Sequence, residues 1–117
     1  MRAERLPLKR RGIIHATALL ALAVPALADN LPEYQLVLKD HVYRPSELKV
    51  RAGTKFKITV RNEDATPEEF ESTDFNREKI VPPNSTVTVF VGPLSPGSYG
   101  FFGDFHQDTA KGRLIVE

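Results

Sequence analysis

The stretch that decides the fold is the C-terminal run Gly97-Ser98-Tyr99-Gly100-Phe101-Phe102-Gly103-Asp104-Phe105-His106. It is followed by a closing segment, Lys111-Gly112-Arg113-Leu114-Ile115-Val116-Glu117. Aromatic residues recur in the first piece and the second contains Leu114-Ile115-Val116, residue types that are typical of β-strands. A short polar loop that starts near His106, the one histidine of this region, joins the two pieces. The end of the chain therefore predicts a strand, a histidine-bearing loop and a last strand.

Apolar and polar residues also alternate along the chain upstream of this run. The clearest case is residues 55–62, in which Phe56, Ile58 and Val60 share one face. Shorter strands are expected at residues 34–38, 47–50, 69–72, 77–81 and 86–91, and a turn at residues 40–45. Seven or eight short strands with turns between them predict an all-β Greek-key sandwich or barrel.

The N-terminus has the composition of a secretory signal peptide. Basic residues crowd positions 2–11, an apolar run covers 13–24, and Ala26-Leu27-Ala28 fits the small-x-small cleavage pattern. The apolar run is shorter than the about 20 residues that a membrane span needs. We therefore predict a signal peptide over residues 1–28 and a periplasmic domain over residues 29–117 with no permanent membrane span. The Sec route is expected, and Arg10-Arg11 leaves the twin-arginine route as the alternative.

The mature domain would be acidic and free of thiols. Removing five of the 16 basic residues and one of the 15 acidic residues leaves 11 basic against 14 acidic ones. That balance argues against a nucleic-acid partner, which needs a basic surface. The chain contains no cysteine, which excludes disulfides, thiolate metal ligands and cysteine nucleophiles. No Ser/His/Asp arrangement suggests a hydrolase.

The C-terminal run resembles that of the cupredoxins, the fold family of the blue-copper proteins. Their pattern is Gly-x-Tyr-x-Phe-x-Cys-x-x-His, and every element but the cysteine is present here. The stretch Pro45-x-x-Leu48-x-Val50-x-x-Gly53, with the strand after it, matches the usual start of the family. The resemblance covers roughly residues 34–117 and implies the cupredoxin Greek-key barrel.

The resemblance also implies where copper ligands would stand. Blue-copper sites use two histidines, one cysteine and a weak axial ligand, often methionine. Here the first loop, residues 64–71, holds glutamates and no histidine, and Gly103 stands at the cysteine position. His106 is kept, and the methionine position falls near Ala110 or Lys111. One ligand of four survives, so a blue type 1 copper centre is excluded.

Oxygen and imidazole donors remain at this end of the chain. Carboxylate and imidazole ligands suit Fe(III), Cu(II), Mn(II) or Zn(II) better than Cu(I). The candidate metal ligands are Glu68, Glu69, Asp104, His106 and Asp108.

Each candidate also has an ordinary structural explanation. Loop glutamates are commonly solvated, aspartates commonly cap turns, and His106 would hold the loop by a hydrogen bond. A register shift of one residue exchanges the faces of Glu68 and Glu69, so the pattern leaves open which one points inward. His41, which follows an aspartate in a turn, is expected to be a surface histidine.

Two phrases, residues 64–72 and 101–112, resemble a narrower group, the cupredoxin domains of bacterial iron-uptake systems. These are the EfeO-type domains and the stand-alone proteins that accompany an Ftr-type iron permease. In EfeO-type domains a glutamate before an aromatic residue, matching Glu69, is a proposed metal ligand. That group also uses cysteines, which this chain lacks.

The expected function is that of a periplasmic protein that binds or relays a metal ion, iron or Cu(II), in high-affinity iron uptake. Its partners would be an iron permease and a periplasmic iron- or copper-binding protein. Clustered acids attract a hard cation, which suits this role. The alternatives are a ferroxidase-like electron-transfer partner, which would make the protein an enzyme, and a metal-free interaction module.

Overall fold

Alternating apolar side chains hold two β-sheets together. The computed structural model describes residues 30–117. In it Phe56, Ile58 and Val60 are buried in one strand, as their alternation predicts. The predicted signal peptide and its cleavage site lie outside the described residues. Within residues 30–117 no helix is long and apolar enough to cross a membrane.

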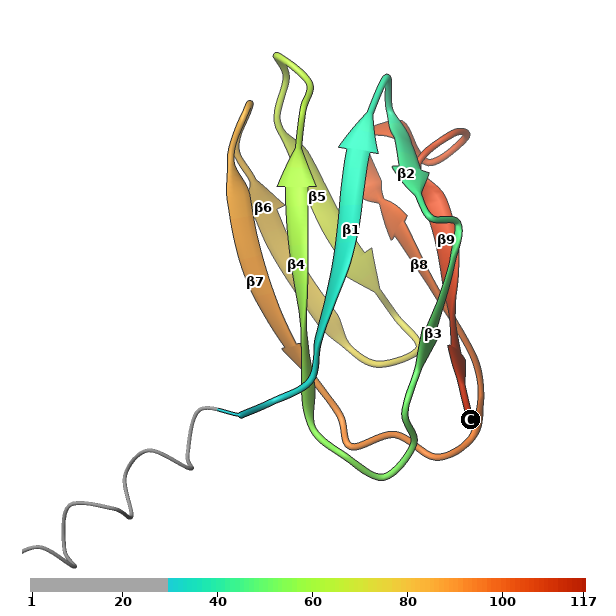
Figure 1. The fold of residues 1–117 in the computed structure, drawn as a ribbon. Helices are drawn as coiled ribbons and strands as arrows, with labels where there is room; N and C mark the ends of the chain where they lie inside the picture. Colours follow the sequence, from blue (N-terminus) through green and yellow to red (C-terminus); the bar gives the residue numbers. More distant parts are fainter. Residues whose placement is uncertain (1–29) are drawn as a thin grey trace, which may run out of the picture. The chain divides into compact units, whose positions relative to one another are not determined.

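Nine strands and one 3-10 helix make up the described part of the chain, and Figure 1 labels the strands. They are β1 (Glu33–Lys39), β2 (Val42–Arg44), β3 (Glu47–Val50), β4 (Phe56–Asn62), β5 (Glu68–Ser72), β6 (Arg77–Val81), β7 (Thr86–Val91), β8 (Gly97–Gly103), η2 (Asp104–His106) and β9 (Lys111–Val116).

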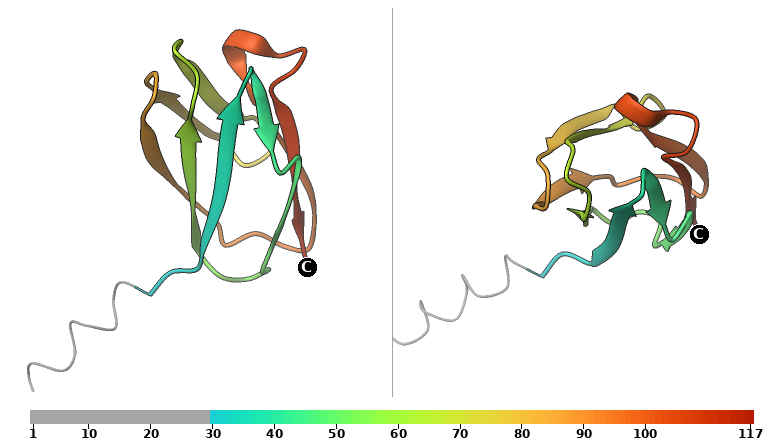
Figure 2. Two further views of the ribbon diagram at one scale, coloured as in Figure 1. Left: turned by 45° about the horizontal axis from the view of Figure 1, so that its top comes forward. Right: turned by 90° about the horizontal axis from the view of Figure 1, so that it is seen from above.

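The strands form a four-stranded sheet, β2-β1-β4-β7, and a five-stranded sheet, β3-β9-β8-β5-β6. The chain passes repeatedly from one sheet to the other, and β1 pairs with β4, and β3 with β9, in parallel. The view from above in Figure 2 shows the strands arranged around a common interior. The all-β prediction is confirmed.

The expected turn at residues 40–45 is wrong in part, because Val42–Arg44 forms β2 and pairs with the end of β1. The turn is confined to Asp40 and His41, which both adopt positive φ angles of 53° and 60°. Because the turn takes only these two residues, the next three are free to form the short strand β2. It also buries Tyr43 in the core.

Large apolar side chains from both sheets fill the core. Aromatic rings of the five-stranded sheet meet there, with Phe70 and Phe101 stacked at a centroid distance of 5.5 Å. Tyr43 from the other sheet meets Phe101 edge-on at 5.4 Å. Aliphatic side chains such as Leu36 and Leu114 are fully buried around them.

Loops at the end of the sandwich opposite the C-terminus carry the candidate site residues (Figures 1 and 2). The β1–β2 turn brings His41 there, β5 begins there with Glu68, and β8 ends there and leads into η2. We call this end the His106 pole. Pairing of β5 with β8, which sets Phe70 opposite Gly103, brings the first loop and the histidine loop together.

Candidate functional site

Glu68 points into the protein and Glu69 points outward, which answers the question that the sequence left open. The Glu68 side chain is fully buried, whereas Glu69 is partly exposed. Three donors hold the buried carboxylate. The backbone N–H groups of Phe105 and Glu69 donate to Oε1 over 2.8 and 3.1 Å. Nδ1 of His106 lies 2.6 Å from Oε2. A buried carboxylate needs such partners to offset its lost hydration.

His106 is thus the side-chain partner of a buried charge. A second contact also holds it, because its ring stacks on His41 with the ring centroids 3.5 Å apart and 12° between the planes. About a quarter of the His106 side chain remains exposed, 28%. The predicted ligands Glu68 and His106 are therefore in contact. Glu68 is buried in the core, and His106 lies between it and the solvent.

His41 is not the simple surface histidine that the sequence suggested. It is half-buried against His106, and a second residue holds its backbone. The carboxylate of Asp64 accepts hydrogen bonds from the backbone N–H groups of Asp40 and His41 over 2.7 and 3.0 Å. Burial alone would raise the pKa of Asp64, but these two donors outweigh it and lower the pKa. The left-handed turn and its carboxylate cap position the imidazole over His106.

A buried polar atom without a hydrogen-bond partner lies within electrostatic reach of Glu68. The Tyr43 hydroxyl has no hydrogen-bond partner among the described residues, although its side chain is almost completely buried. Burial raises the pKa of Tyr43, and the negative charge of Glu68 raises it further. The phenol therefore stays protonated, as a donor close to the Glu68 carboxylate.

Gly103 leaves the space that the Glu68 carboxylate fills. A Cβ at this position would lie 2.5 Å from Cδ of Glu68, 2.8 Å from its Oε2 and 2.9 Å from Cβ of Ala110. Real Cβ atoms essentially never approach other heavy atoms closer than 3.0 Å. A side chain at position 103 and the Glu68 carboxylate in its present place therefore exclude each other.

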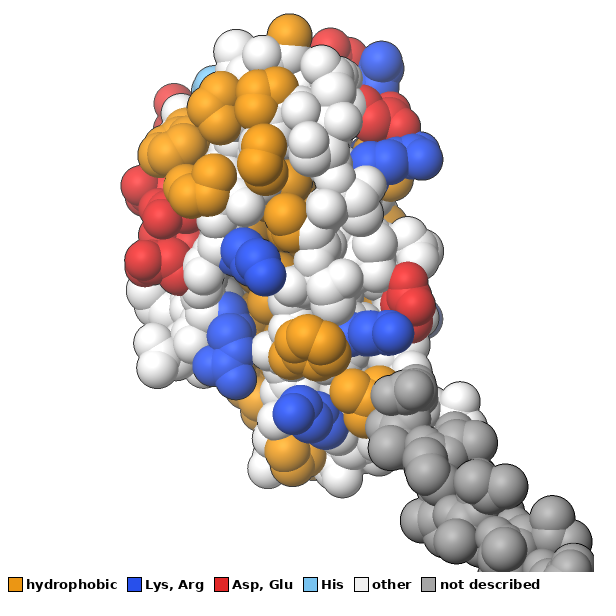
Figure 3. Space-filling view, turned by 90° about the vertical axis from the view of Figure 1, so that its left-hand side faces the viewer, with side chains coloured by type: hydrophobic (Ala, Val, Ile, Leu, Met, Phe, Trp, Pro, Cys, Tyr) orange, Lys and Arg blue, Asp and Glu red, His pale blue; other side chains and the backbone are white. Residues whose placement is uncertain are grey.

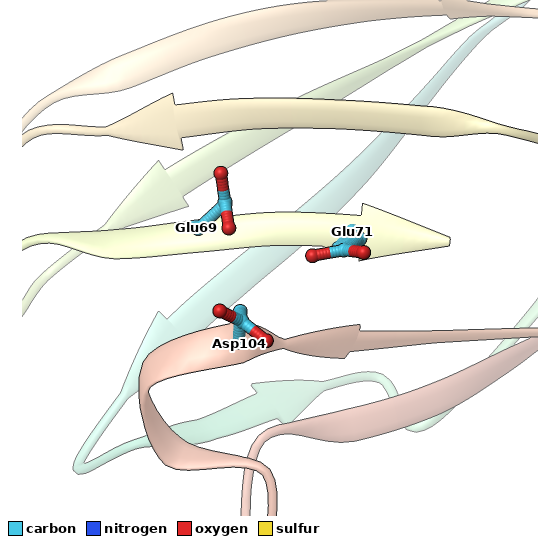
Figure 4. A group of neighbouring side chains, drawn as sticks. All are labelled: Glu69, Glu71 and Asp104. Atoms are coloured by element: carbon cyan, nitrogen blue, oxygen red, sulfur yellow. The ribbon is translucent and has the colours of Figure 1, made fainter. Parts of the chain in front are cut away.

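A second group of carboxylates lies on the outer face of the same pole. Glu69, Glu71 and Asp104 each offer an oxygen, and the three oxygens lie within 4.8 Å of one another. Figure 4 shows the first two side chains on β5 and the third at the start of η2. Desolvation raises the pKa of Glu69, and repulsion by nearby acids, Glu78 first, raises it further. We call these three residues the outer carboxylate group.

The five predicted ligands thus fall into different places. Glu68 and His106 form the inner pair, and Glu69 and Asp104 belong to the outer carboxylate group. Asp108 is exposed and belongs to neither. Sequence reasoning missed Glu71 as a partner of Asp104, although its alternation with Glu69 on one strand would have put both on the same face.

Charged and apolar side chains occupy different parts of the surface that β6 and β7 form. Figure 3 displays acidic side chains along both borders of this face, with apolar and basic side chains between them. The exposed apolar residues include Ile80 and Phe90. Arg77 and Lys79 donate to the backbone carbonyls of Phe90 and Thr88, which joins the edges of the two sheets.

The chain matches the cupredoxin-like domain family over residues 12–116, nearly its whole length. It belongs to the cupredoxin-like family. An uncharacterised protein of Rickettsia prowazekii (strain Madrid E) is 48% identical to it over 88 residues, which cover 75% of this chain and 70% of the relative. This relative is uncharacterised and adds no activity.

Solved cupredoxin structures share the fold at low sequence identity. The metal-binding domain of the Cu(I)-exporting ATPase CopA of Streptococcus pneumoniae D39 superimposes with a TM-score of 0.68 at 13% identity, covering 76% of this chain and 88% of that one. Auracyanin A, a blue copper protein of Chloroflexus aurantiacus, gives 0.64 at 16%, covering 75% and 100%. Both are copper-binding proteins, and their likeness to this chain concerns the fold.

The donors of this cupredoxin-like domain do not fit a blue-copper centre. Such a centre needs a cysteine thiolate, and the chain has none. The structure adds a steric reason, because the Glu68 carboxylate fills the space in which a side chain at position 103 would begin. The Nδ1 atom of His106 is engaged by the same carboxylate. The pole offers oxygen and imidazole donors instead.

Proposed function

We propose that this cupredoxin-like protein binds or relays a hard metal ion in the periplasm as a component of high-affinity iron uptake. The observation that carries the proposal is the convergence of three carboxylates, Glu69, Glu71 and Asp104, within 4.8 Å at the pole that also holds His106. Oxygen donors in such a group favour hard cations over Cu(I).

Electrostatics support cation capture at this pole. The raised pKa of Glu69 shows that its negative charge is disfavoured by desolvation and by neighbouring acids, Glu78 and Glu71 among them. A bound cation would relieve that repulsion, so the group gains more from a cation than an isolated surface acid does. An excess of acids in residues 29–117 adds long-range attraction of the same sign.

Iron enters the proposal through the resemblance of residues 64–72 and 101–112 to the cupredoxin domains of iron-uptake systems. An Ftr-type permease and a periplasmic iron- or copper-binding protein are the partners this implies. Cu(II) remains the other metal to test, because the solved structures of similar fold are those of copper proteins.

The test is to titrate the purified protein with Fe(II), Fe(III), Cu(II), Zn(II) and Mn(II) and to measure metal affinity and stoichiometry by calorimetry. Glu69→Ala and His106→Ala report on the two parts of the pole, and Glu47→Gln, an exposed acid on β3, serves as the control. We expect a stoichiometric cation whose affinity falls in Glu69→Ala and is unchanged in the control. If no metal binds the unmodified protein above the level of non-specific binding, the proposal fails.

One observation favours a metal-free interaction module as the second candidate. The inner pair, Glu68 and His106, already satisfies its charge and hydrogen bonds without a cation. In that case the pole would act as a docking surface, and metal titration would be negative for every variant. A ferroxidase-like role is separated from simple binding by measuring Fe(II) oxidation with and without added copper.

A further inference from the structure

The outer face of the five-stranded sheet carries acids on one side of its middle strand and bases on the other. We propose that two copies of this protein associate through this face, with strand β9 of each copy lying over strand β5 of the other. The charges then meet their opposites across the interface.

The side chains of this outer face follow from the alternation along its strands. Alternate residues of β5, β8 and β9 are buried between the two sheets, so their neighbours project outward. The outward side chains are Glu69 and Glu71 on β5, Phe102 on β8, and Lys111 and Arg113 on β9. Figure 4 shows the two glutamates on β5.

One row across this face carries the charges in a fixed order. Strand pairing sets Glu71 beside Phe102, and Phe102 beside Lys111. On the far side Glu78 of β6 pairs with Glu71. From β6 to β9 the row is therefore acid, acid, aromatic, base. Glu71 and Lys111 stand two strand spacings apart, roughly 10 Å between their backbones, with the Phe102 strand between them.

This order is self-complementary under a twofold axis. Strand β8 is the middle strand of the five. An axis that runs along β8 in the plane of the interface turns a second copy face to face with the first and sets its β9 over β5. Lys111 of each copy then lies opposite Glu71 of the other, because both stand level with Phe102. Face-to-face sheets keep their strands within about 30° of each other, which preserves this match near the axis.

Apolar surface lies at the centre of the proposed contact. Phe102 stands on the axis and meets its counterpart there. A hollow of about 300 Å³ beside it, bordered by Gly100, Lys111 and Arg113 among others, gives the opposing ring room. Ile80 pairs with Glu69 across β5 and β6 and is 48% exposed, which adds an apolar side chain at the rim.

The charges of this face are not neutralised within one copy. Within residues 30–117 the ion pairs involve neither Lys111 nor the acids of the row. Desolvation and then repulsion by neighbouring acids raise the pKa of Glu69, so a lysine of a second copy would relieve that repulsion. Exposed ion pairs each contribute little. We therefore expect a weak dimer that depends strongly on salt.

The first experiment measures self-association of the exported protein by sedimentation equilibrium, with chelator present, over a range of protein concentrations. We expect a monomer–dimer equilibrium at low salt. Its dissociation constant should rise about tenfold or more at high salt, because screening weakens the exposed pairs. Protein that stays monomeric at every concentration in low salt overturns the proposal.

The second experiment tests the pairing by charge reversal. Glu71→Lys and Lys111→Glu should each weaken the dimer about tenfold or more, because like charges then face each other. An equimolar mixture of the two variants should associate again, since both junctions regain opposite charges. A single chain carrying both changes should also dimerise, and it keeps the original net charge. The control Lys39→Glu, at an exposed position on β1 of the other sheet, should stay within about twofold of the unmodified protein.

Two results of this second experiment would overturn the proposed arrangement. One is a dimer of unchanged strength in both single variants, which would place the contact on another surface. The other is a mixture of the two variants that stays monomeric, which would show that Glu71 and Lys111 do not face each other.

The dimer and the proposed metal site are tested separately. Glu71 belongs to the outer carboxylate group, so a cation and a second copy compete for the same acid, and chelator removes the cation. If no metal binds but charge reversal acts as expected, the proposed function fails and the dimer stands. If metal binds and the protein is monomeric throughout, the proposed function stands and the dimer falls.

Discussion

Removal of the His106 imidazole is the perturbation whose cost can be worked out most directly from the structure. His106→Ala leaves the fully buried Glu68 carboxylate without its side-chain partner. Breaking a fully buried ion pair in this way costs about 3–5 kcal/mol, and a hydrogen bond to a charged group contributes about 1.5–3 kcal/mol. Because 28% of His106 is exposed and Glu68 keeps two backbone donors, we expect a loss of about 2–3 kcal/mol.

The matched variant is Glu68→Gln, which removes the charge but keeps the size of the side chain. Its amide oxygen can still accept from the backbone of Phe105, so we expect a smaller loss of about 1 kcal/mol. Urea or thermal unfolding followed by circular dichroism, with chelator present, measures both. For a domain of under 100 residues, 2–3 kcal/mol corresponds to a fall of roughly 10–20 °C in Tm.

The order of these two variants tests the reasoning. The unpaired buried charge is the reason for the larger effect, so His106→Ala must be the less stable protein. The reasoning is refuted if Glu68→Gln costs as much as His106→Ala, or if His106→Ala costs less than about 1 kcal/mol. The double variant should lose less than the sum of the two, because without the charge the missing imidazole matters little.

Three further predictions follow from other parts of the structure. Asp64→Asn should make the stability of the protein less sensitive to acid. The lowered pKa of Asp64 means that its contribution is present above its ordinary pKa of 3.8 and is lost as the pH falls below it, which unfolding titrations between neutral and acid pH measure. Glu69→Gln should leave the melting temperature at neutral pH unchanged or slightly raised, because the raised pKa shows that the ionised form is disfavoured, and should weaken cation binding in calorimetry. Mass spectrometry of the exported protein should find a mature N-terminus directly after Ala28, as the cleavage pattern predicts.

Each of these has a result that would contradict it. An acid unfolding midpoint that is the same in Asp64→Asn and the unmodified protein would show that the cap of the β1–β2 turn does not titrate in this way. A marked destabilisation of Glu69→Gln would mean that the outer carboxylate group is a stabilising network. Recovery of the exported protein with its first 28 residues intact would remove the predicted signal peptide.

The strands and the core were predictable because their signal is local. Alternation of apolar and polar residues needs only neighbours in the chain, and it placed Phe56, Ile58 and Val60 in the core correctly. The short strand β2 was missed because its three residues lie between two turn signals. Whether such a segment pairs depends on β1, which lies across the turn.

The sequence by itself determined that this domain has no thiolate and that its available donors at the pole are carboxylates and imidazole. Only the tertiary structure decided how they are arranged. It turned Glu68 inward onto His106 and Glu69 outward to Asp104, and it stacked His41 on His106. These contacts join segments that lie far apart in the chain, so their geometry is set by strand register and sheet packing. The space above Gly103 is likewise a property of the folded protein, because the atoms that fill it come from another strand.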